Sequence, residues 1–149
     1  MKIALGCDHG GIVLKESVIK AIKDLGCEYI DCGTMTSESV DYPDFATKVA
    51  TKIQDGNADK GVLMCGTGIG ISIAANKYKG IRCAHVTDVF QAEMSAEHNN
   101  ANIIAIGGRV SSPEEAYLFV KKFLSTEFAG GRHQNRIDKI TDIESSQFK

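Results

Sequence analysis

Cys65 stands directly before a run of alternating glycines, Gly66-Thr67-Gly68-Ile69-Gly70. The apolar residues 61–65 are predicted to form a buried strand, and residues 69–76 a helix. Glycines between a strand and a helix let the backbone turn sharply and direct several N–H groups at one point, where the helix dipole adds positive potential. The loop is therefore predicted to bind an anion, either a phosphate or an oxyanion. A tight turn that needs glycine only for its backbone geometry is the alternative.

The position of Cys65 favours a partly ionised thiol, because the start of a helix presents exposed backbone donors. A thiolate there can act as a nucleophile or as a general base. A base beside an oxyanion-stabilising loop suits proton abstraction next to a carbonyl, where negative charge develops on oxygen. From position alone, a structural cysteine buried at the end of a strand fits equally well.

Two familiar kinds of phosphate site do not match this spacing. The loop is neither the dinucleotide pattern G-x-G-x-x-G nor a P-loop, because no Gly-Lys-Ser or Gly-Lys-Thr follows it. A cysteine-based phosphatase would need an arginine at position 71 to clamp the phosphate, and this chain has Ile71 there. The matching position after Cys7 is Val13, so that class is excluded as well.

Other polar residues follow the predicted strands. Asp8 and His9 come directly after the strand at residues 2–7, and Arg109 lies just beyond the strand at residues 102–106. In a parallel sheet, ligands bind beyond the carboxyl ends of the strands, so these side chains are candidates for the same site as Cys65. Each of them alone could equally be a cap or a solvated surface residue.

Two further groups lie outside that edge of the sheet. His98 and Asn99 end a predicted helix, where a simple helix C-cap is the alternative role. Arg132 and Arg136 follow the break at Gly130-Gly131. If this segment is helical, the two guanidinium groups share one face and, with Arg109, could bind a phosphate by charge-assisted hydrogen bonds.

Short apolar runs alternate with amphipathic segments from end to end, which predicts a doubly wound, Rossmann-like α/β fold with helices on both faces of the sheet. No linker or repeat divides the sequence, so residues 1–149 are expected to form one domain. Ser112, Pro113 and Glu115 predict a capping box at a helix start. The five expected strands cover residues 2–7, 27–32, 61–65, 81–86 and 102–106, and the expected helices cover residues 11–25, a segment from Pro43, 69–76, 88–98, a segment from Ser112, and 133–145.

Composition excludes several classes of function. A net charge of -2 with no cluster of Lys or Arg gives no reason to expect nucleic acid as a partner. The apolar runs are too short to cross a membrane, and Asp8 comes too early for a signal peptide, so a cytoplasmic protein is expected. Five cysteines without a C-x-x-C pair argue against a disulfide framework and against a structural metal site.

Several of these segments together resemble the ribose-5-phosphate isomerase B family, which includes galactose-6-phosphate and allose-6-phosphate isomerases. The matching stretches follow the family's order along nearly the whole chain. They are Gly6-Cys7-Asp8-His9-Gly10-Gly11, Asp41-Tyr42-Pro43, residues 65–77, Gly80-Ile81-Arg82, His98-Asn99 and residues 130–136.

The resemblance implies interconversion of an aldose phosphate with its ketose through a cis-enediolate, without metal or organic cofactor. Cys65 matches the family's base. The groups that stabilise the enediolate match the amides of Gly66, Thr67, Gly68, Ile69 and Gly70. Thr67 would bind the sugar oxygens or relay a proton between them. His98 matches the acid that opens the furanose ring, with Asp8 as its partner. The phosphate ligands of the family match His9, Arg109, Arg132 and Arg136, and a sugar contact matches Asn99.

The family shares each active site between two subunits, so the resemblance also implies a homodimer, which could pair into a tetramer. Ribose 5-phosphate is the expected substrate, with allose 6-phosphate and galactose 6-phosphate as alternatives. A non-catalytic sugar-phosphate sensor would keep the loop and the arginines but would need neither Cys65 nor His98. A nucleotide-binding α/β module is the remaining alternative, and it lacks a nucleotide fingerprint.

Overall fold

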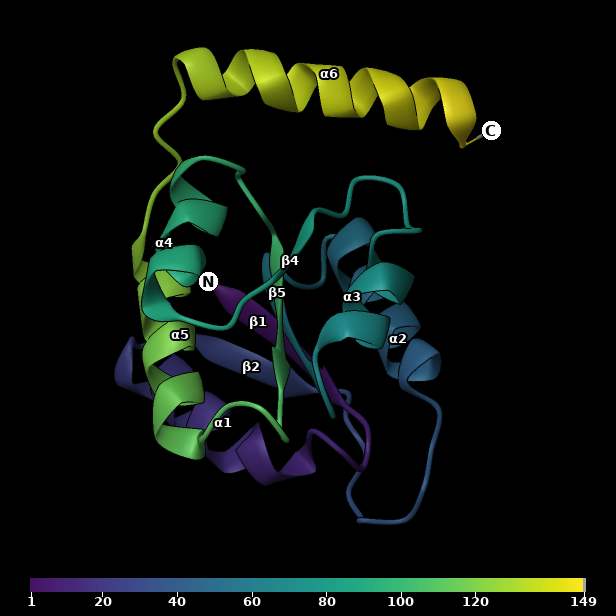
Figure 1. Ribbon diagram of the computed structural model, residues 1–149, viewed down its shortest axis with the longest axis vertical. Helices are drawn as coiled ribbons and strands as arrows, with labels where there is room; N and C mark the ends of the chain where they lie inside the picture. The colour runs from purple at the N-terminus through teal and green to yellow at the C-terminus, as the bar shows by residue number, and fades with distance from the viewer. Residues whose placement is uncertain (149) are drawn as a thin grey trace.

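Strands and helices alternate through residues 1–148, the part of the chain that the computed structural model describes (Figure 1). The strands are β1 (Lys2–Cys7), β2 (Glu28–Asp31), β3 (Lys60–Cys65), β4 (Cys83–His85) and β5 (Ile103–Gly107). The helices are the 3₁₀ turn η1 (Ile12–Leu14), α1 (Lys15–Asp24), α2 (Tyr42–Gln54), α3 (Ile69–Ala75), α4 (Val89–Glu97), α5 (Pro113–Ser125) and α6 (Arg132–Gln147).

The five strands form one sheet in the order β2-β1-β3-β5-β4, and every pairing in it is parallel. The predicted five-stranded parallel sheet is therefore confirmed. In the register of the central strands, Cys7 lies opposite Met64, and Cys65 lies opposite Gly107. The carboxyl ends of β1, β3 and β5 consequently meet at one edge, as the sequence analysis required.

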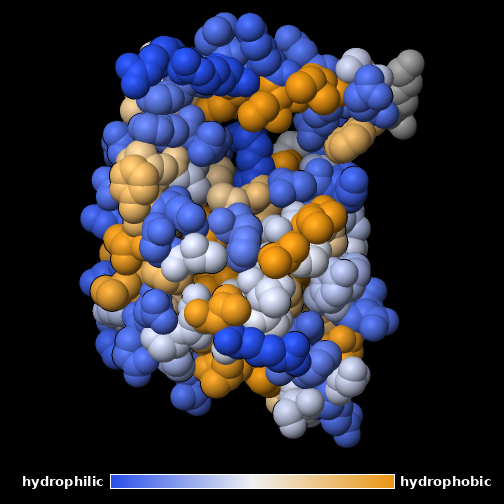
Figure 2. Space-filling model, in the orientation of Figure 1, coloured by the Kyte–Doolittle hydropathy of each residue, from blue (hydrophilic) through white to orange (hydrophobic). Residues whose placement is uncertain are grey.

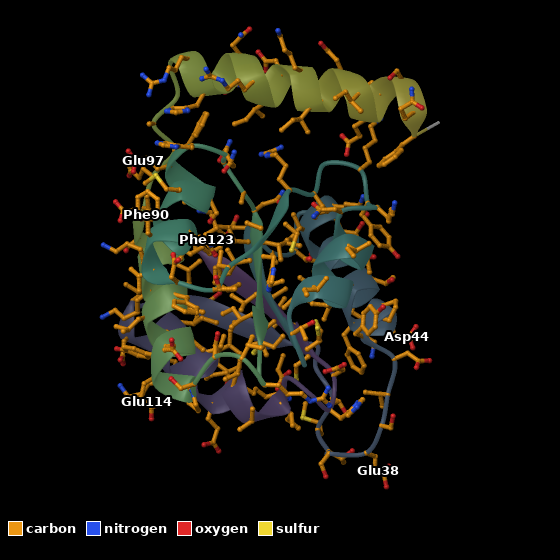
Figure 3. All side chains as sticks on the ribbon, viewed as in Figure 1. Glu38, Asp44, Phe90, Glu97, Glu114 and Phe123 are labelled. Atoms are coloured by element: carbon orange, nitrogen blue, oxygen red, sulfur yellow. The ribbon has the colours of Figure 1, made fainter. Side chains whose placement is uncertain are left out.

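Helices cover both faces of the sheet (Figure 1). On one face, α1, α4 and α5 enclose the larger apolar cluster, which includes the fully buried Phe123 of α5, labelled in Figure 3. On the other face, α2 and α3 pack over a second cluster, to which β3 contributes Leu63 and Cys65. Because alternate residues of a strand point to opposite faces, Cys65 faces α2 and α3, whereas Met64 faces the larger cluster.

The predicted boundaries need three corrections. The helix expected over residues 11–25 begins as the 3₁₀ turn η1, and the last helix starts at Arg132 and continues to Gln147. The strand expected over residues 81–86 is shorter, Cys83–His85. At this edge of the sheet the Asn76 side chain accepts from the amide of Cys83 at 2.8 Å and donates to its carbonyl at 2.9 Å, which occupies backbone groups that a further strand would otherwise pair.

Helix α6 lies across the end of the molecule from which the strands start, apart from the two layers of helices (Figure 1). Ile137 is its one buried residue, while Ile140 and Ile143 are largely exposed. These two side chains line a groove of about 400 Å³ between α6 and the segment around β4. Figure 2 shows apolar side chains along the underside of α6, above a hollow. Among residues 1–148, no helix has the length and apolar character needed to cross a membrane.

The predicted capping box at the start of α5 is confirmed, because Ser112 accepts from the amide of Glu115 and Glu115 accepts from the amide of Ser112. Ser112→Ala should lower the free energy of unfolding by about 1 kcal/mol, since the amide of Glu115 loses its acceptor. Urea unfolding at one fixed protein concentration measures the change. Ser37→Ala, in an exposed loop, is the control and should change stability by less than about 0.5 kcal/mol. Equal stability of both variants would contradict this role of the cap.

Candidate active site

A cavity of about 790 Å³ opens where β1, β3 and β5 end, within the size range of small-molecule sites. Its walls come from the ends of these strands, from the glycine loop and from the start of α2, whose Asp44 is labelled in Figure 3. The residues that line it are Asp8, His9, Val40, Asp41, Tyr42, Pro43, Asp44, Cys65, Gly66, Thr67, Ile69, Gly70 and Arg109. The structure thus brings together most of the residues predicted for this edge of the sheet.

Cys65 is the last residue of β3, and its side chain is 4% exposed at the base of this cavity. Its Sγ accepts a hydrogen bond of 3.2 Å from the amide of Gly68. Gly68 directs that amide back to the sulfur from a left-handed conformation with φ of 82°, which a residue with a side chain rarely adopts. A backbone donor on the sulfur stabilises a thiolate relative to the thiol, so the geometry suits proton transfer at this position.

Backbone contacts from neighbouring strands hold the loop in place. The amide of Gly108 donates to the carbonyl of Cys65 at 2.8 Å, and the amide of Arg109 donates to the carbonyl of Gly66 at 2.9 Å. The Arg109 guanidinium lies against Gly66, where a Cβ would come within 2.7 Å of its Nη1, so glycine leaves room for this close approach. From β4, His85 Nε2 lies 2.8 Å from the carbonyl oxygen of Thr67. This contact gives His85 a structural role in holding the loop.

Thr67 is exposed at the mouth of the cavity, where its hydroxyl oxygen accepts from the amide of Ile69 at 3.2 Å. The hydroxyl hydrogen is free to rotate towards an acceptor in the cavity. In this position Thr67 can donate a hydrogen bond to a ligand oxygen.

Asp8 and His9 differ in how much of their hydrogen-bonding capacity they offer to the cavity. The buried Asp8 carboxylate accepts from the amides of Gly10 and Gly11, at 2.8 and 3.1 Å, and so fixes the turn after β1. His9 Nδ1 accepts from the amide of Val40 at 3.2 Å. A neutral His9 therefore carries its proton on Nε2, where it can donate to an anion.

Two other cysteines at strand positions, Cys7 and Cys83, have raised pKa values. Burial raises the pKa of Cys7 to about 11 and that of Cys83 to about 12. Both are therefore neutral thiols near pH 7, and they pack as small apolar side chains. Within residues 1–148, no three His, Cys, Asp or Glu side chains gather in a way that suits a metal ion.

The remaining predicted site residues lie at the opposite end of the sheet. His98 directly follows α4, and its ring stacks on that of His133 in the first turn of α6, with ring centroids 4.1 Å apart and an interplanar angle of 14°. Arg132 and Arg136 lie four residues apart on successive turns of α6 and so share one face, as their spacing predicted. Desolvation beside the His98 ring, together with the charges of these two arginines, lowers the pKa of His133. We call His98, Asn99, Arg132, His133 and Arg136 the His98 cluster.

Within one chain, the His98 cluster does not reach the cavity around Cys65. His98 and Asn99 precede β5, whereas Cys65 and Gly107 end β3 and β5, and a five-residue strand is roughly 16 Å long. Figure 3 shows the same division, with Glu97 beside the start of α6 and with Glu38 and Asp44 at the far end. The predicted pairing of Asp8 with His98 is accordingly absent within the chain.

Val40, Asp41 and Tyr42, at the start of α2, form one wall of the cavity although no role is predicted for them from the sequence. Tyr42 packs against Gly70 and covers the start of α3. The one available signal was Asp41-Tyr42-Pro43 at a predicted helix start, because residues just before a helix can lie at the ligand edge of such a sheet.

Comparison with known proteins agrees with this geometry. The model of the ribose/galactose isomerase family matches residues 3–140. The chain is 46% identical over 143 residues to ribose-5-phosphate isomerase B of Escherichia coli, covering 96% of each chain. It superposes on ribose-5-phosphate isomerase B of Clostridium thermocellum with a TM-score of 0.94 and 51% identity, covering 98% of this chain and 99% of the other.

A second solved structure, ribose-5-phosphate isomerase B of Mycoplasma genitalium, contains bound ribulose 5-phosphate. It superposes with a TM-score of 0.92 and 38% identity over 98% of this chain and 97% of that one. The match of the family model agrees with the comparisons of single proteins. These cover nearly the whole chain, and their sequence identities are higher than a shared fold alone would require. The chain belongs to the ribose/galactose isomerase family.

Proposed function

We propose that this chain interconverts ribose 5-phosphate and ribulose 5-phosphate, with Cys65 as the base that carries the proton between C2 and C1. The observation that supports this role most directly is the hydrogen bond of 3.2 Å from the Gly68 amide to Cys65 Sγ, at the base of a cavity large enough for a sugar phosphate. A backbone donor in this place is positioned to bind the negative charge of a thiolate that acts as a general base.

In the proposed reaction the Cys65 thiolate removes the proton from C2 of the open-chain aldose, and the electron pair moves to the carbonyl oxygen O1. The resulting cis-enediolate takes a proton from the Cys65 thiol at C1, while a proton passes from O2 to O1 and yields the ketose; a proton held on the sulfur can exchange with solvent before it returns. Thr67 is placed to bind these two oxygens or to relay the proton between them, because its hydroxyl faces the cavity. No electron leaves the sugar, so the reaction needs no redox cofactor.

Two amides of the glycine loop are already engaged in the free protein. The Gly68 amide donates to Cys65 Sγ, and the Ile69 amide donates to Thr67 Oγ1. We therefore assign stabilisation of the enediolate oxygen chiefly to the amides of Gly66, Thr67 and Gly70, with Gly68 and Ile69 acting through the sulfur and the hydroxyl. Fixed donors at the site where charge develops lower the barrier without reorganisation.

The phosphate is proposed to bind His9 Nε2 and Arg109 of one chain together with Arg132 and Arg136 of a second copy. Ring opening is proposed for His98 of that second copy, with Asn99 beside it on the sugar. This arrangement is supported by the separation of the His98 cluster from the cavity within one chain, and by the exposed apolar side chains Ile140 and Ile143 on α6. The active unit is then a homodimer, which could pair into a tetramer in the cytoplasm.

Separate assays distinguish the base from the ring-opening acid. Ribulose 5-phosphate cannot close a five-membered ring because its O5 carries the phosphate, so exchange of its C1 proton with deuterium from solvent needs Cys65 but no ring opening. Cys65→Ala should lower both ribose 5-phosphate turnover and this exchange by about 10²–10⁴-fold. His98→Asn should lower turnover of ribose 5-phosphate while exchange continues at a rate close to that of the unchanged protein.

Both rates follow from NMR spectra of the sugar phosphates in D₂O. Cys27→Ala, which replaces a half-buried thiol outside the cavity, is the control and should keep both activities. Undiminished turnover in Cys65→Ala would remove Cys65 as the base and would favour a sugar-phosphate sensor.

Sharing of the site between two copies has its own test. When Cys65→Ala and His98→Asn chains are co-expressed, half of the randomly formed dimers contain one chain of each kind, and each such dimer has one site with both residues intact. About a quarter of the activity of the unchanged protein should therefore return, as expected for an isologous dimer. If each site belonged to a single chain, no mixed dimer would contain an intact site and activity would stay at the level of the two variants.

Substrate length is the remaining choice within this family. Ribose 5-phosphate should have a kcat/KM about 10–200-fold higher than allose 6-phosphate or galactose 6-phosphate, the discrimination that one additional carbon typically gives in a fitted pocket. Steady-state rates on the three sugars measure this preference. A higher kcat/KM for either hexose phosphate would reassign the substrate while leaving the role of Cys65 untouched.

A further inference from the structure

The turn that carries His98 and Asn99 ends in a strained conformation. Asn100 has a φ of 44°, in the left-handed region that residues with side chains seldom adopt. The last carbonyl groups of α4 and of this turn have no partner within the helix itself. A turn of this kind keeps its shape only where the surrounding structure holds it.

Arg82, directly before β4, binds those carbonyl groups. Its Nε donates to the carbonyl oxygens of Asn99 and Asn100, both at 3.1 Å, and its Nη2 donates to that of Asn100 at 2.7 Å. The positive guanidinium also lies at the negative end of the α4 dipole. One side chain thus occupies the carbonyls that directly follow His98.

The backbone of Arg82 is tied to the same turn. Its amide donates to Asn102 Oδ1 at 2.9 Å, and its carbonyl accepts from the amide of Asn102 at 3.0 Å. Asn102 Nδ2 in turn donates to the carbonyl of Gly80 at 2.8 Å. The segment before β4 and the turn after α4 therefore form one hydrogen-bonded unit, with Arg82 at its centre. Burial lowers the pKa of Arg82, which shows that the guanidinium is partly removed from water to make these contacts.

We propose that Arg82 is a positioning residue for ring opening, which sets the direction of His98 and Asn99 through the carbonyls of the turn between them and β5. The proposal rests on the roles given above to His98 and Asn99, because Arg82 lies outside the cavity around Cys65 and does not line it. His133 fixes the plane of the His98 ring by stacking, and Arg82 fixes the backbone from which that ring projects. Together these contacts restrict the ring to one direction.

A lysine cannot replace Arg82 in this position. The planar guanidinium directs several donors in a fixed fork at two carbonyls, whereas an ammonium group is a single point charge. Arg82→Lys therefore retains the positive charge at the end of α4 but loses the geometry. Displacement of a reacting group by about 1 Å can lower a rate by about 10²-fold, so a large loss is expected from a conservative change.

The experiment compares Arg82→Lys and Arg82→Met with the control Lys79→Met, which removes an exposed cation from the same segment. Turnover of ribose 5-phosphate and deuterium exchange at C1 of ribulose 5-phosphate are measured over a range of substrate concentrations up to saturation. Arg82→Lys should lower ribose 5-phosphate kcat by about 10–100-fold, the range expected for misplaced reacting groups, while C1 exchange stays close to that of the control. KM should rise for both sugars, because Asn99 contacts each of them.

Hydrogen exchange of the amides of residues 98–102, followed by mass spectrometry, tests the structural step directly and should accelerate in Arg82→Lys but not in Lys79→Met. If Arg82→Lys lowers both activities in parallel, its effect is on general stability and the proposal is overturned. Unchanged kcat with faster amide exchange overturns it as well, because the turn would then be loosened without consequence for ring opening.

His98→Asn, measured in the same assays, separates failure of this proposal from failure of the proposed function. Where His98→Asn separates turnover from exchange and Arg82→Lys does not, the role of Arg82 is wrong and that of His98 stands. Where His98→Asn itself fails to separate them, His98 is not the ring-opening acid and the positioning role of Arg82 falls with it.

Discussion

The parallel register of β1, β3 and β5 is the constraint on which the site depends. Because Cys7 pairs with Met64 and Cys65 with Gly107, the three strands end within one residue of one another, and their loops emerge at a common edge. Backbone hydrogen bonds continue beyond the strands and join Gly108 to Cys65 and Arg109 to Gly66. The glycine loop is thus held from the side by the next strand's loop. A slip of one residue in β3 would turn Cys65 towards the larger apolar cluster and away from the cavity.

The same topology explains why the predicted residues divide into two groups. In a doubly wound sheet each helix returns the chain from the carboxyl ends of the strands to their amino ends, so a residue at the end of a helix lies opposite the ligand edge. His98 ends α4, and Arg132 and Arg136 begin the helix that crosses that end of the molecule. No rearrangement of side chains within one chain can bring them to Cys65. A second copy is the simplest source of these groups, and this is why oligomeric state and mechanism are linked in the proposal.

Much of the fold followed from local sequence pattern, and so did the part of the site that lies at strand ends. The apolar strands, the capping box at Ser112 and the glycine loop each depend on neighbours in the sequence, which makes them predictable. The contacts that the sequence analysis missed join distant segments. Tyr42 on Gly70, His133 on His98 and Arg82 on Asn100 are pairs whose members meet only through the tertiary path of the chain. The length of β4 was overestimated for a similar reason, since only Cys83–His85 pair with β5, and the partner strand is distant in the sequence.

The three thiols at strand positions differ in the groups that surround the sulfur. Cys7 and Cys83 sit in surroundings that raise their pKa values to about 11 and about 12, because burial disfavours the charged form and few donors offset it. Cys65 is almost as inaccessible as Cys7, yet its sulfur receives the Gly68 amide and borders the cavity. A parallel strand that ends in a left-handed glycine turn supplies this donor without any charged side chain. In the proposed mechanism this backbone donor stands where a lysine or histidine could have been, and the positive groups of the chain remain available for the phosphate.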